Sequence, residues 1–473
     1  MKNLRALALL APVLFVPLAC ENSSSPSASF VPEAGPGFEA GPSPEAGPVP
    51  DAGDDGPVTP PAPKGVTITV TEDGAVKADV RVLGHDATGT LNGDKKTDAT
   101  GKVFFALAPS MVTVLNGGKV NVAPVTYLGV ADGDKLVVAI KTSALAPDQV
   151  PYAQITASFA ADPISTKGNG FFVRVGGGCT GSASLVDVPV NVDLYPYCLG
   201  TKNALLTTVT NNGNLTEYGF AKDIAVTMGA KVNVGPLAGA VPGATKVTAS
   251  HLPSSQTTSR FAQLGAIANG AVFDVGNASG TLDTGDLTFP TATGFAEAYQ
   301  PAVSISLFGN FSSTKAFVRR EPTTAPVSAT LADFDFATAL PFIQTGTVVT
   351  STPARPDVTF TSEAPLTAAD GGIATLGWFI SSTDGNGTWT FVLPPSATGF
   401  TVPALPADAS LFGPVGTVTL RDVTFVESNL LPGYSELKLL PIQPAVGVDF
   451  IDTSKPLPVA GTVKVTRFSG QLR

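Results

Sequence analysis

Short segments in which apolar and polar residues alternate recur along the chain from residue 65 to its end. Residues 66–70 place an apolar side chain at every second position, and residues 76–82 repeat the pattern. Side chains of a β-strand alternate between the two faces of a sheet with this same period. The pattern therefore predicts half-buried strands.

Later segments show the same period. Residues 186–194 are apolar on one face, and Pro189 lacks an amide hydrogen, which favours the edge of a sheet. Trp378 and Trp389 lie in two strand-like segments that flank the residues Asp384-Gly-Asn386-Gly, a strong hairpin signal. Residues 333–336, 417–420 and 461–466 complete the predicted C-terminal strands.

Composition agrees with this pattern. The 473 residues include 49 glycines and 41 prolines, and only 14% are charged. Many valines, threonines and phenylalanines with frequent Gly and Pro are typical of short strands joined by tight turns. The chain is long enough for several domains. We therefore predict an all-β fold.

One region has a recognisable order of elements. Thr97-Asp98-Ala99-Thr100-Gly101 follows a predicted strand and precedes an aromatic strand, a short turn and another strand at 111–114. Asp98 can accept a hydrogen bond from the backbone two residues on, and Gly101 can adopt a positive φ. This order resembles the carboxypeptidase regulatory-like (prealbumin-like) sandwich. The resemblance implies a non-catalytic accessory module and no peptidase.

The N-terminus has the features of an export signal. Lys2 and Arg5 precede an unbroken apolar stretch over residues 6–16, and Pro17-Leu18-Ala19 leads directly to Cys20. The stretch is too short to span a bilayer and has the flanks of a secretory signal. It resembles the lipobox of bacterial lipoproteins, in which the cysteine is acylated and becomes the first residue, although Pro17 stands where that family usually has leucine. The resemblance implies lipidation of Cys20.

An acidic linker follows. Glu33, Glu39 and Glu45 each begin the sequence Glu-Ala-Gly-Pro at a spacing of six, and residues 21–63 hold no lysine or arginine. Repeated proline, charge repulsion and few buriable side chains predict a disordered, extended spacer. Such a spacer resembles those of Gram-negative outer-membrane lipoproteins, and Glu21 agrees with outer-membrane sorting in that family. We expect an outer-membrane protein that faces the periplasm or the cell surface.

These signals divide the chain into five parts. We predict two or three Ig-like or prealbumin-like β-sandwich domains after a signal peptide and a disordered stalk. The predicted parts are a signal peptide (1–19), the lipidated cysteine and linker (20–64), a carboxypeptidase regulatory-like sandwich (65–146), a β-rich domain with a disulfide (147–325) and a C-terminal β-rich domain (326–473).

The cysteine count fits that location. The chain has three cysteines, and with Cys20 assigned to lipid, Cys179 and Cys198 remain as a pair. An oxidising compartment makes a disulfide between them the default. A metal site at this pair would need further ligands, and the chain holds only His85 and His251.

Candidate catalytic residues are few. His251 follows a predicted strand but has no Gly-x-Ser-x-Gly motif with it, and His85 is predicted to lie in a turn. Asp333 and Asp335 would share one strand face at a separation that a glycosidase pair could use. Phe334 then occupies the buried face, so we interpret the aspartates as the solvent face. We predict no catalytic residue, and an enzyme is the less favoured reading.

Two further patterns have alternatives. Asp132-Gly-Asp134 and Asp384-Gly-Asn386 could donate oxygens to Ca²⁺, but neither is followed by the bidentate acid of an EF-hand, and both are better interpreted as turns. The two tryptophans could stack on sugar rings if they were exposed, or form a cross-strand core pair if they were buried. We favour the core, and predict no metal and no cofactor.

The charge pattern limits the partners. The net charge is −10 with no basic patch, which excludes nucleic acid because neutralising phosphates requires clustered lysine and arginine. We predict a lipid-anchored cell-envelope protein with a non-catalytic structural, adhesive or ligand-binding role. Its expected partners are the membrane, through the anchor, and an envelope or extracellular glycan or protein. The alternative is a carbohydrate-binding or glycan-hydrolysing surface protein.

Overall fold

The computed structural model describes most of the chain after residue 63. Cys20, the linker up to residue 63, Cys198 and Asp384 lie outside the described residues. The described residues are 64–117, 122–140, 153–158, 170–175, 179–182, 190–194, 200–211, 214–226, 231–233, 238–239, 241–252, 258–280, 286–291, 294–308, 312–322, 330–352, 354–381, 385–443, 457 and 459–470.

The fold is all-β, as the alternation predicted. The described helices are the six-residue α1 (Tyr434–Leu439) and two short 3₁₀ turns, η2 (Phe336–Thr338) and η3 (Ala407–Phe412). None of the described helices has the length and apolarity needed to span a membrane.

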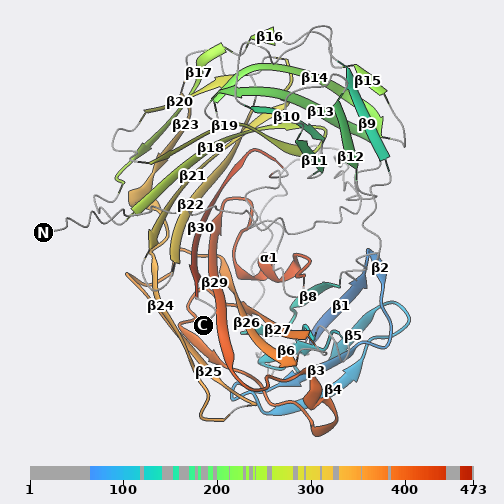
Figure 1. The fold of residues 1–473 in the computed structure, drawn as a ribbon. Helices are drawn as coiled ribbons and strands as arrows, with labels where there is room; N and C mark the ends of the chain where they lie inside the picture. Colours follow the sequence, from blue (N-terminus) through green and yellow to red (C-terminus); the bar gives the residue numbers. More distant parts are fainter. Residues whose placement is uncertain are drawn as a thin grey trace, which may run out of the picture.

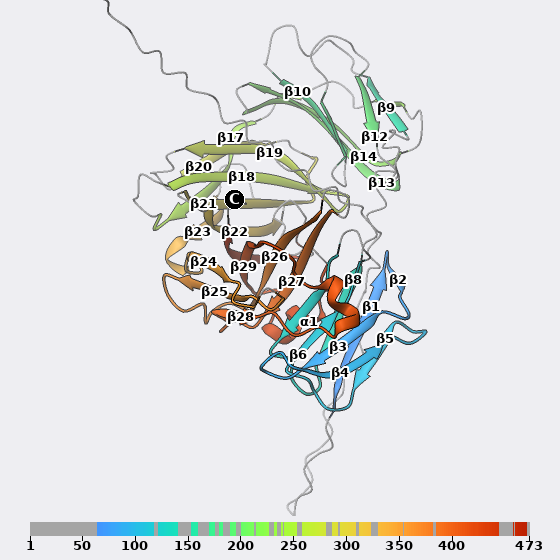
Figure 2. The ribbon, with the colours of Figure 1, turned by 60° about the horizontal axis from the view of Figure 1, so that its bottom comes forward.

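A twelve-stranded sheet runs through the molecule (Figures 1 and 2). Figure 2 shows its strands succeeding one another from β19 in the upper half to β4 at the bottom. In sheet order the strands are β19 (Ala271–Gly280), β18 (Thr258–Ala268), β21 (Ala298–Phe308), β22 (Ser312–Pro322), β30 (Gly461–Ser469), β29 (Val418–Ser428), β26 (Gly371–Ser381), β27 (Gly385–Leu393), β7 (Val125–Leu128), β6 (Met111–Val114), β3 (Arg81–His85) and β4 (Leu91–Lys96).

Three smaller sheets pack against this long sheet and enclose three cores. On β30, Val463 and Val465 belong to one core and Phe468 to another, so the cores lie on opposite faces. The first small sheet contains β1 (Val66–Glu72), β2 (Ala75–Val76), β5 (Lys102–Phe105) and β8 (Lys135–Ile140), the second β20 (Asp286–Thr291), β17 (Val241–Ser250) and β23 (Thr330–Asp335), and the third β24 (Ile343–Val349), β25 (Asp357–Ser362) and β28 (Gly399–Thr401).

The described strands between residues 153 and 239 form two further sheets (Figure 1). Strand β12 lies at the end of its three-stranded sheet, where the proline before it predicted an edge. One sheet contains β11 (Cys179–Ser182), β10 (Gly170–Val175), β13 (Gly200–Asn211), β14 (Asn214–Val226) and β16 (Ala238–Gly239), and the other β12 (Val190–Leu194), β9 (Ala153–Ser158) and β15 (Lys231–Asn233).

Several local predictions are confirmed. Strand β1 alternates between buried and half-buried positions, and β26 and β27 form the predicted antiparallel hairpin. In the predicted turn, Asp98 Oδ1 accepts from the amides of Thr100 at 2.8 Å and Lys102 at 3.1 Å, and Gly101 has φ 71°. The side chain thus replaces backbone partners inside the turn.

The same four residues, Asp-Ala-Thr-Gly, build a second turn that the sequence interpretation missed. Asp86 Oδ1 accepts from the amides of Thr88 at 2.8 Å and Thr90 at 2.9 Å, and Gly89 has φ 78°. Identical local sequence therefore gives identical turn chemistry at both ends of β4.

The expected domain boundaries do not coincide with breaks in the long sheet. Across 146/147, β7 pairs with β27 in parallel, with Thr126 opposite Phe391. Across 325/326, β22 pairs with β30, with Val318 opposite Val463. The sandwich-like units therefore share one sheet. Pairing between strands so distant in sequence leaves no local periodicity that a boundary prediction could detect.

Candidate functional site

The first polar group of interest is His85, which ends strand β3 and is not in the predicted turn. Its side chain is fully buried, and its Nε2 lies 3.1 Å from Thr113 Oγ1. Burial, aided by the positive charge of Arg355, lowers the pKa of His85 to about 4. The imidazole is therefore neutral at pH 7.

His85 ends a row of buried polar groups. Thr113 Oγ1 lies 2.8 Å from Thr126 Oγ1, and Trp389 Nε1 donates to Thr126 Oγ1 at 2.8 Å. Because indole is a donor only, one consistent direction runs from Trp389 through both hydroxyls to His85 Nε2 as acceptor. The row joins the first sandwich to the β26–β27 hairpin and satisfies polar groups that burial would otherwise penalise.

Both tryptophans lie in the interior. Trp389 is fully buried and Trp378 is 3% exposed. Trp378 faces Gly387 across the hairpin, where a Cβ would lie 2.0 Å from the indole ring. Burial of both rings agrees with the favoured core interpretation, but the expected cross-strand pair of tryptophans is wrong, because Trp389 lies opposite Leu376. Neither ring offers a face on which a sugar could stack, because stacking requires exposed aromatic surface.

The outer face of the first sandwich is also covered. Leu83 and Leu115 pack with Ala409 of η3, beside Leu405 and Phe412. A free-standing sandwich would present this face to solvent. We call the contact between residues 81–134 and residues 355–438 the junction.

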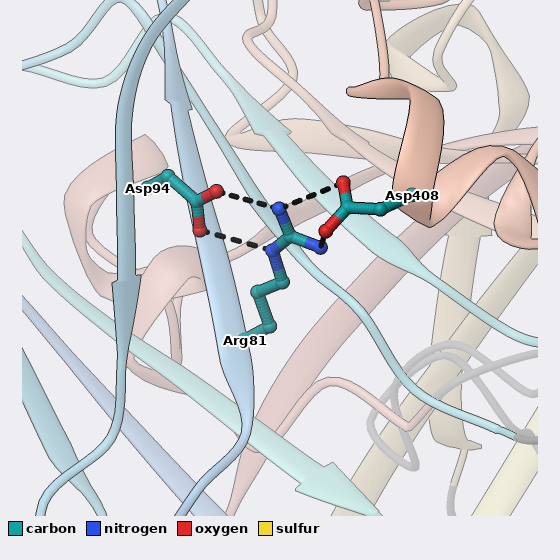
Figure 3. Close-up of polar contacts among 3 residues, drawn as sticks. All are labelled: Arg81, Asp94 and Asp408. Atoms are coloured by element: carbon teal, nitrogen blue, oxygen red, sulfur yellow. Dashed lines mark hydrogen bonds and ion pairs between the residues drawn. The ribbon is translucent and has the colours of Figure 1, made fainter.

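Charged groups close the rim of the junction (Figure 3). Arg81 Nε and Nη2 donate to the Asp94 carboxylate at 3.0 and 2.6 Å, and Nη1 and Nη2 donate to the Asp408 carboxylate at 2.8 and 3.2 Å. The hydrogen bonds that Arg81 donates to Asp94 and then to Asp408 raise the pKa of Arg81 above its ordinary value. A planar guanidinium can hold two carboxylates in this forked geometry.

A second ion pair lies deeper in the junction. Lys438 Nζ of α1 contacts Asp134 Oδ2, with side-chain exposures of 3% and 10%, and lies 4.6 Å from the centre of the Tyr434 ring. Tyr434 Oη lies 2.6 Å from the carbonyl oxygen of Leu128 and 3.1 Å from that of Val392. One side chain thus contacts the backbones of β7 and β27, the parallel pair that crosses the first boundary.

The same pair bears on the calcium reading of Asp132-Gly-Asp134. Asp132 accepts from the amides of Lys64 at 2.9 Å and Gly65 at 2.6 Å. Asp134 accepts from the amide of Ala131 at 2.8 Å as well as from Lys438. The ammonium and the amides therefore occupy both carboxylates. The turn interpretation is confirmed, because the Asp134 amide donates to the carbonyl oxygen of Ala131 at 3.1 Å. Within the described ranges, no group of three or more metal-ligating side chains gathers.

His251 belongs to a different environment. It follows β17 with φ 52°, and its Nδ1 lies 2.6 Å from Asp335 Oδ1. A hydrogen bond from the Ala337 amide, and then the one to His251, lowers the pKa of Asp335. The side chains are 66% and 42% exposed. Catalysis by preorganised charge depends on excluding water, and this site does not exclude it.

The aspartate pair has the predicted placement. Asp333 is exposed and accepts from Thr248 Oγ1 at 2.5 Å, whereas Phe334 and Phe336 are buried. The solvent-face interpretation of Asp333 and Asp335 is therefore confirmed.

Of the two cysteines in the predicted disulfide, only Cys179 lies among the described residues. Cys179 begins strand β11, opposite Val175 of β10, and Cys198 lies outside the described residues. Lipidation of Cys20 and the loop that contains Asp384 fall outside them as well.

Comparison with known proteins gives no relative that assigns a function. No family model and no curated protein matches the chain. Among solved structures, the chain is similar to the crystal structure of chicken CNTN1 FN1-FN3 domains, at 9% identity over 55% of this chain and 84% of that one. The TM-score is 0.13, which is too low to indicate a shared overall fold.

The ion pairs of the junction were missed by sequence reasoning. Asp408 lies 327 positions from Arg81, and Lys438 lies 304 positions from Asp134. No spacing rule connects residues at such distances. The only available signal was the turn at Asp132-Gly-Asp134, which indicated carboxylates in need of partners but not which partners.

Proposed function

We propose that this chain is a lipid-anchored protein of the cell envelope, in the outer membrane, with a non-catalytic structural, adhesive or ligand-binding role. The signal-like N-terminus ending at Cys20 and the acidic linker support the anchor. The resemblance of the first sandwich to carboxypeptidase regulatory-like modules, which are accessory units, supports the absence of catalysis.

The observation that carries the structural role is the shared twelve-stranded sheet. Strands from all three predicted folded regions contribute to it, so the regions are not independent domains joined by flexible linkers. At the junction, Arg81 bonds Asp408, Lys438 bonds Asp134 and Trp389 donates to Thr126, each across the two segments. A rigid body built in this way suits a scaffold more than a hinged enzyme.

The anchor is tested by changing Cys20. In Cys20→Ser, the protein should move from the membrane fraction to the soluble fraction, because acylation has lost its thiol. Cys179→Ser serves as the control for loss of a cysteine and should stay in the membrane fraction. Unchanged membrane association of Cys20→Ser would contradict the anchor.

The non-catalytic role is tested by complementation. Cells lacking the protein are scored for sensitivity to detergent, and variants are then reintroduced. The double variant His251→Asn, Asp335→Asn removes the exposed acid–base pair and should restore wild-type resistance. Cys20→Ser should not restore it. A folded His251 variant that fails to complement would indicate chemistry at that pair.

We also propose the disulfide between Cys179 and Cys198. Thiol titration of the oxidised, unfolded mature protein should find neither cysteine reactive. In the reduced protein both should react. The bond should stabilise the fold by about 2–5 kcal/mol. Two reactive thiols in the oxidised sample would refute the bridge.

A further inference from the structure

Strand β24 is an edge strand. It belongs to the order β24-β25-β28 and pairs with β25 alone among the described strands. Its inner face packs on the long sheet, where a Cβ at Gly346 would lie 2.6 Å from Leu420 Cδ2 and 2.7 Å from Phe468 Cε1. Figure 1 shows β24 and β25 at the left of the lower half. One row of backbone donors and acceptors on β24 thus has no strand partner in the described part of the chain.

This edge lacks the features that usually protect an edge. Edge strands avoid pairing with other chains through charge, proline, short length or bulges. Strand β24 has seven residues with no charge and no proline, and its one register shift lies near its start, between Ile343 and Thr345. By contrast, the edge strand β4 carries Asp94, Lys95 and Lys96. The other described edge strands of comparable length, β8, β12, β19, β20 and β23, each contain a charged residue.

The exposed face of β24 carries a ladder of hydroxyl groups. Thr345 Oγ1 lies 2.6 Å from Thr361 Oγ1, and Thr347 Oγ1 lies 2.7 Å from Thr359 Oγ1. All four threonines are exposed. Cross-strand threonine pairs stabilise neighbouring strands. The ladder therefore shows that Thr345 and Thr347 each accept a threonine as cross-strand neighbour.

We propose that β24 pairs with β24 of a second copy of this chain, antiparallel and centred on Gly346. In this register Thr345 of each copy lies opposite Thr347 of the other, so the hydroxyl ladder continues across the two-fold axis. Because β24 is uncharged, the pairing places no like charges opposite each other. A comparable pairing of the charged edge strand β4 would do so. A second copy therefore fits this edge by charge and by side chain.

The contact is weak and reversible in solution. One pair of seven-residue strands buries less than the roughly 1,200 Å² of a standard stable interface. The inference goes beyond the proposed function and does not need the lipid anchor. An anchor would favour the pairing by confining the copies to one surface.

The test uses matched double variants in the soluble Cys20→Ser full-length chain. Thr345→Lys with Thr347→Lys places lysines directly opposite each other in the proposed dimer. Thr359→Lys with Thr361→Lys breaks the same two threonine pairs but adds the charge on the inner strand β25. Sedimentation equilibrium should show a wild-type dimer whose dissociation constant rises about tenfold or more in the β24 variant.

The β25 variant should dimerise more nearly like the wild type, with both variants showing the wild-type circular dichroism. A chain that stays monomeric up to millimolar concentration, or equal loss of dimer in both variants, would overturn the proposal.

A second measurement tests the register. Chains carrying Thr345→Cys are mixed with chains carrying Thr347→Cys and oxidised. The proposed pairing puts these two positions opposite each other, so mixed disulfide dimers from equimolar chains should exceed the half of the product that random pairing gives. The random ratio of 1:2:1 would refute the register centred on Gly346, whatever the sedimentation result.

Discussion

Two acid–base pairs in this chain have similar chemistry and opposite surroundings. Lys438 and Asp134 meet inside the junction with side-chain exposures of 3% and 10%, whereas His251 and Asp335 meet at the end of β17 with exposures of 66% and 42%. Water screens the second pair and is excluded from the first. The comparison teaches that burial, and not the identity of the paired groups, decides which pair the fold depends on.

The largest expected effect comes from removing one partner of the buried pair between Lys438 and Asp134. Asp134→Ala leaves the Lys438 ammonium buried without its carboxylate, which should lower the free energy of unfolding by about 3–5 kcal/mol. Urea denaturation measures the loss. The double variant Asp134→Ala, Lys438→Met removes the stranded charge and should recover most of it. Equal destabilisation in both variants would show that the charge is not the cause.

The second effect depends on pH and concerns His85. Its pKa is lowered from 6.5 to about 4 in the folded state, so between these pH values the unfolded chain binds more protons. Stability is unaffected by this group above about pH 6.5 and falls as the pH drops toward about 4. A shift of this size corresponds to about 3 kcal/mol. Denaturation at a series of pH values measures it.

Variants at the two histidines separate the sources of that pH dependence. His85→Gln retains an oxygen acceptor for Thr113 but cannot titrate, so the slope between pH 6.5 and 4 should flatten. His251→Gln, at the exposed histidine, is the matched control for removing an imidazole. A steep slope that survives in His85→Gln would mean that other groups produce it.

A smaller effect is expected at the rim of the junction. Arg81→Ala removes both forked ion pairs, but the carboxylates of Asp94 and Asp408 are 40% and 70% exposed. Surface pairs contribute about 0.2–1 kcal/mol each, and salt weakens them. The loss should therefore shrink when the measurement is repeated at high ionic strength. Arg81→Lys, which keeps the charge without the fork, should fall between Arg81→Ala and the wild type.

The smallest effect is expected at the exposed pair. His251→Asn should leave the thermal midpoint close to that of the wild type, because solvent replaces the lost contact with Asp335. Asparagine also tolerates the positive φ of this position better than most residues. A large drop in the midpoint would show that this pair has a structural role that its exposure hides.

Local structure was predictable where one stretch of chain contains all the partners. The alternation of β1, the hairpin of β26 and β27, and the turn at Asp98 each depend on residues within about two dozen positions. The second turn at Asp86 carried the same four residues and could have been found by comparison with the first. His85 was assigned to a turn because neighbouring Gly and Asp resemble turn chemistry, but its burial depends on distant segments.

The sequence by itself determined most of the strands and their buried faces, the turn chemistry and the solvent face of Asp333 and Asp335, because each follows from periodicity or short-range hydrogen bonding. The segment 76–82, predicted as one strand, is an exception, because β2 ends at Val76 and β3 begins at Arg81, with Asp79 at φ 60° between them. Only the tertiary structure decided that the regions share one sheet and that Arg81 meets Asp408. Hydrogen bonding between strands is the same for any sequence, so pairing partners are chosen by packing complementarity across the whole chain. That complementarity exists only once the chain is folded.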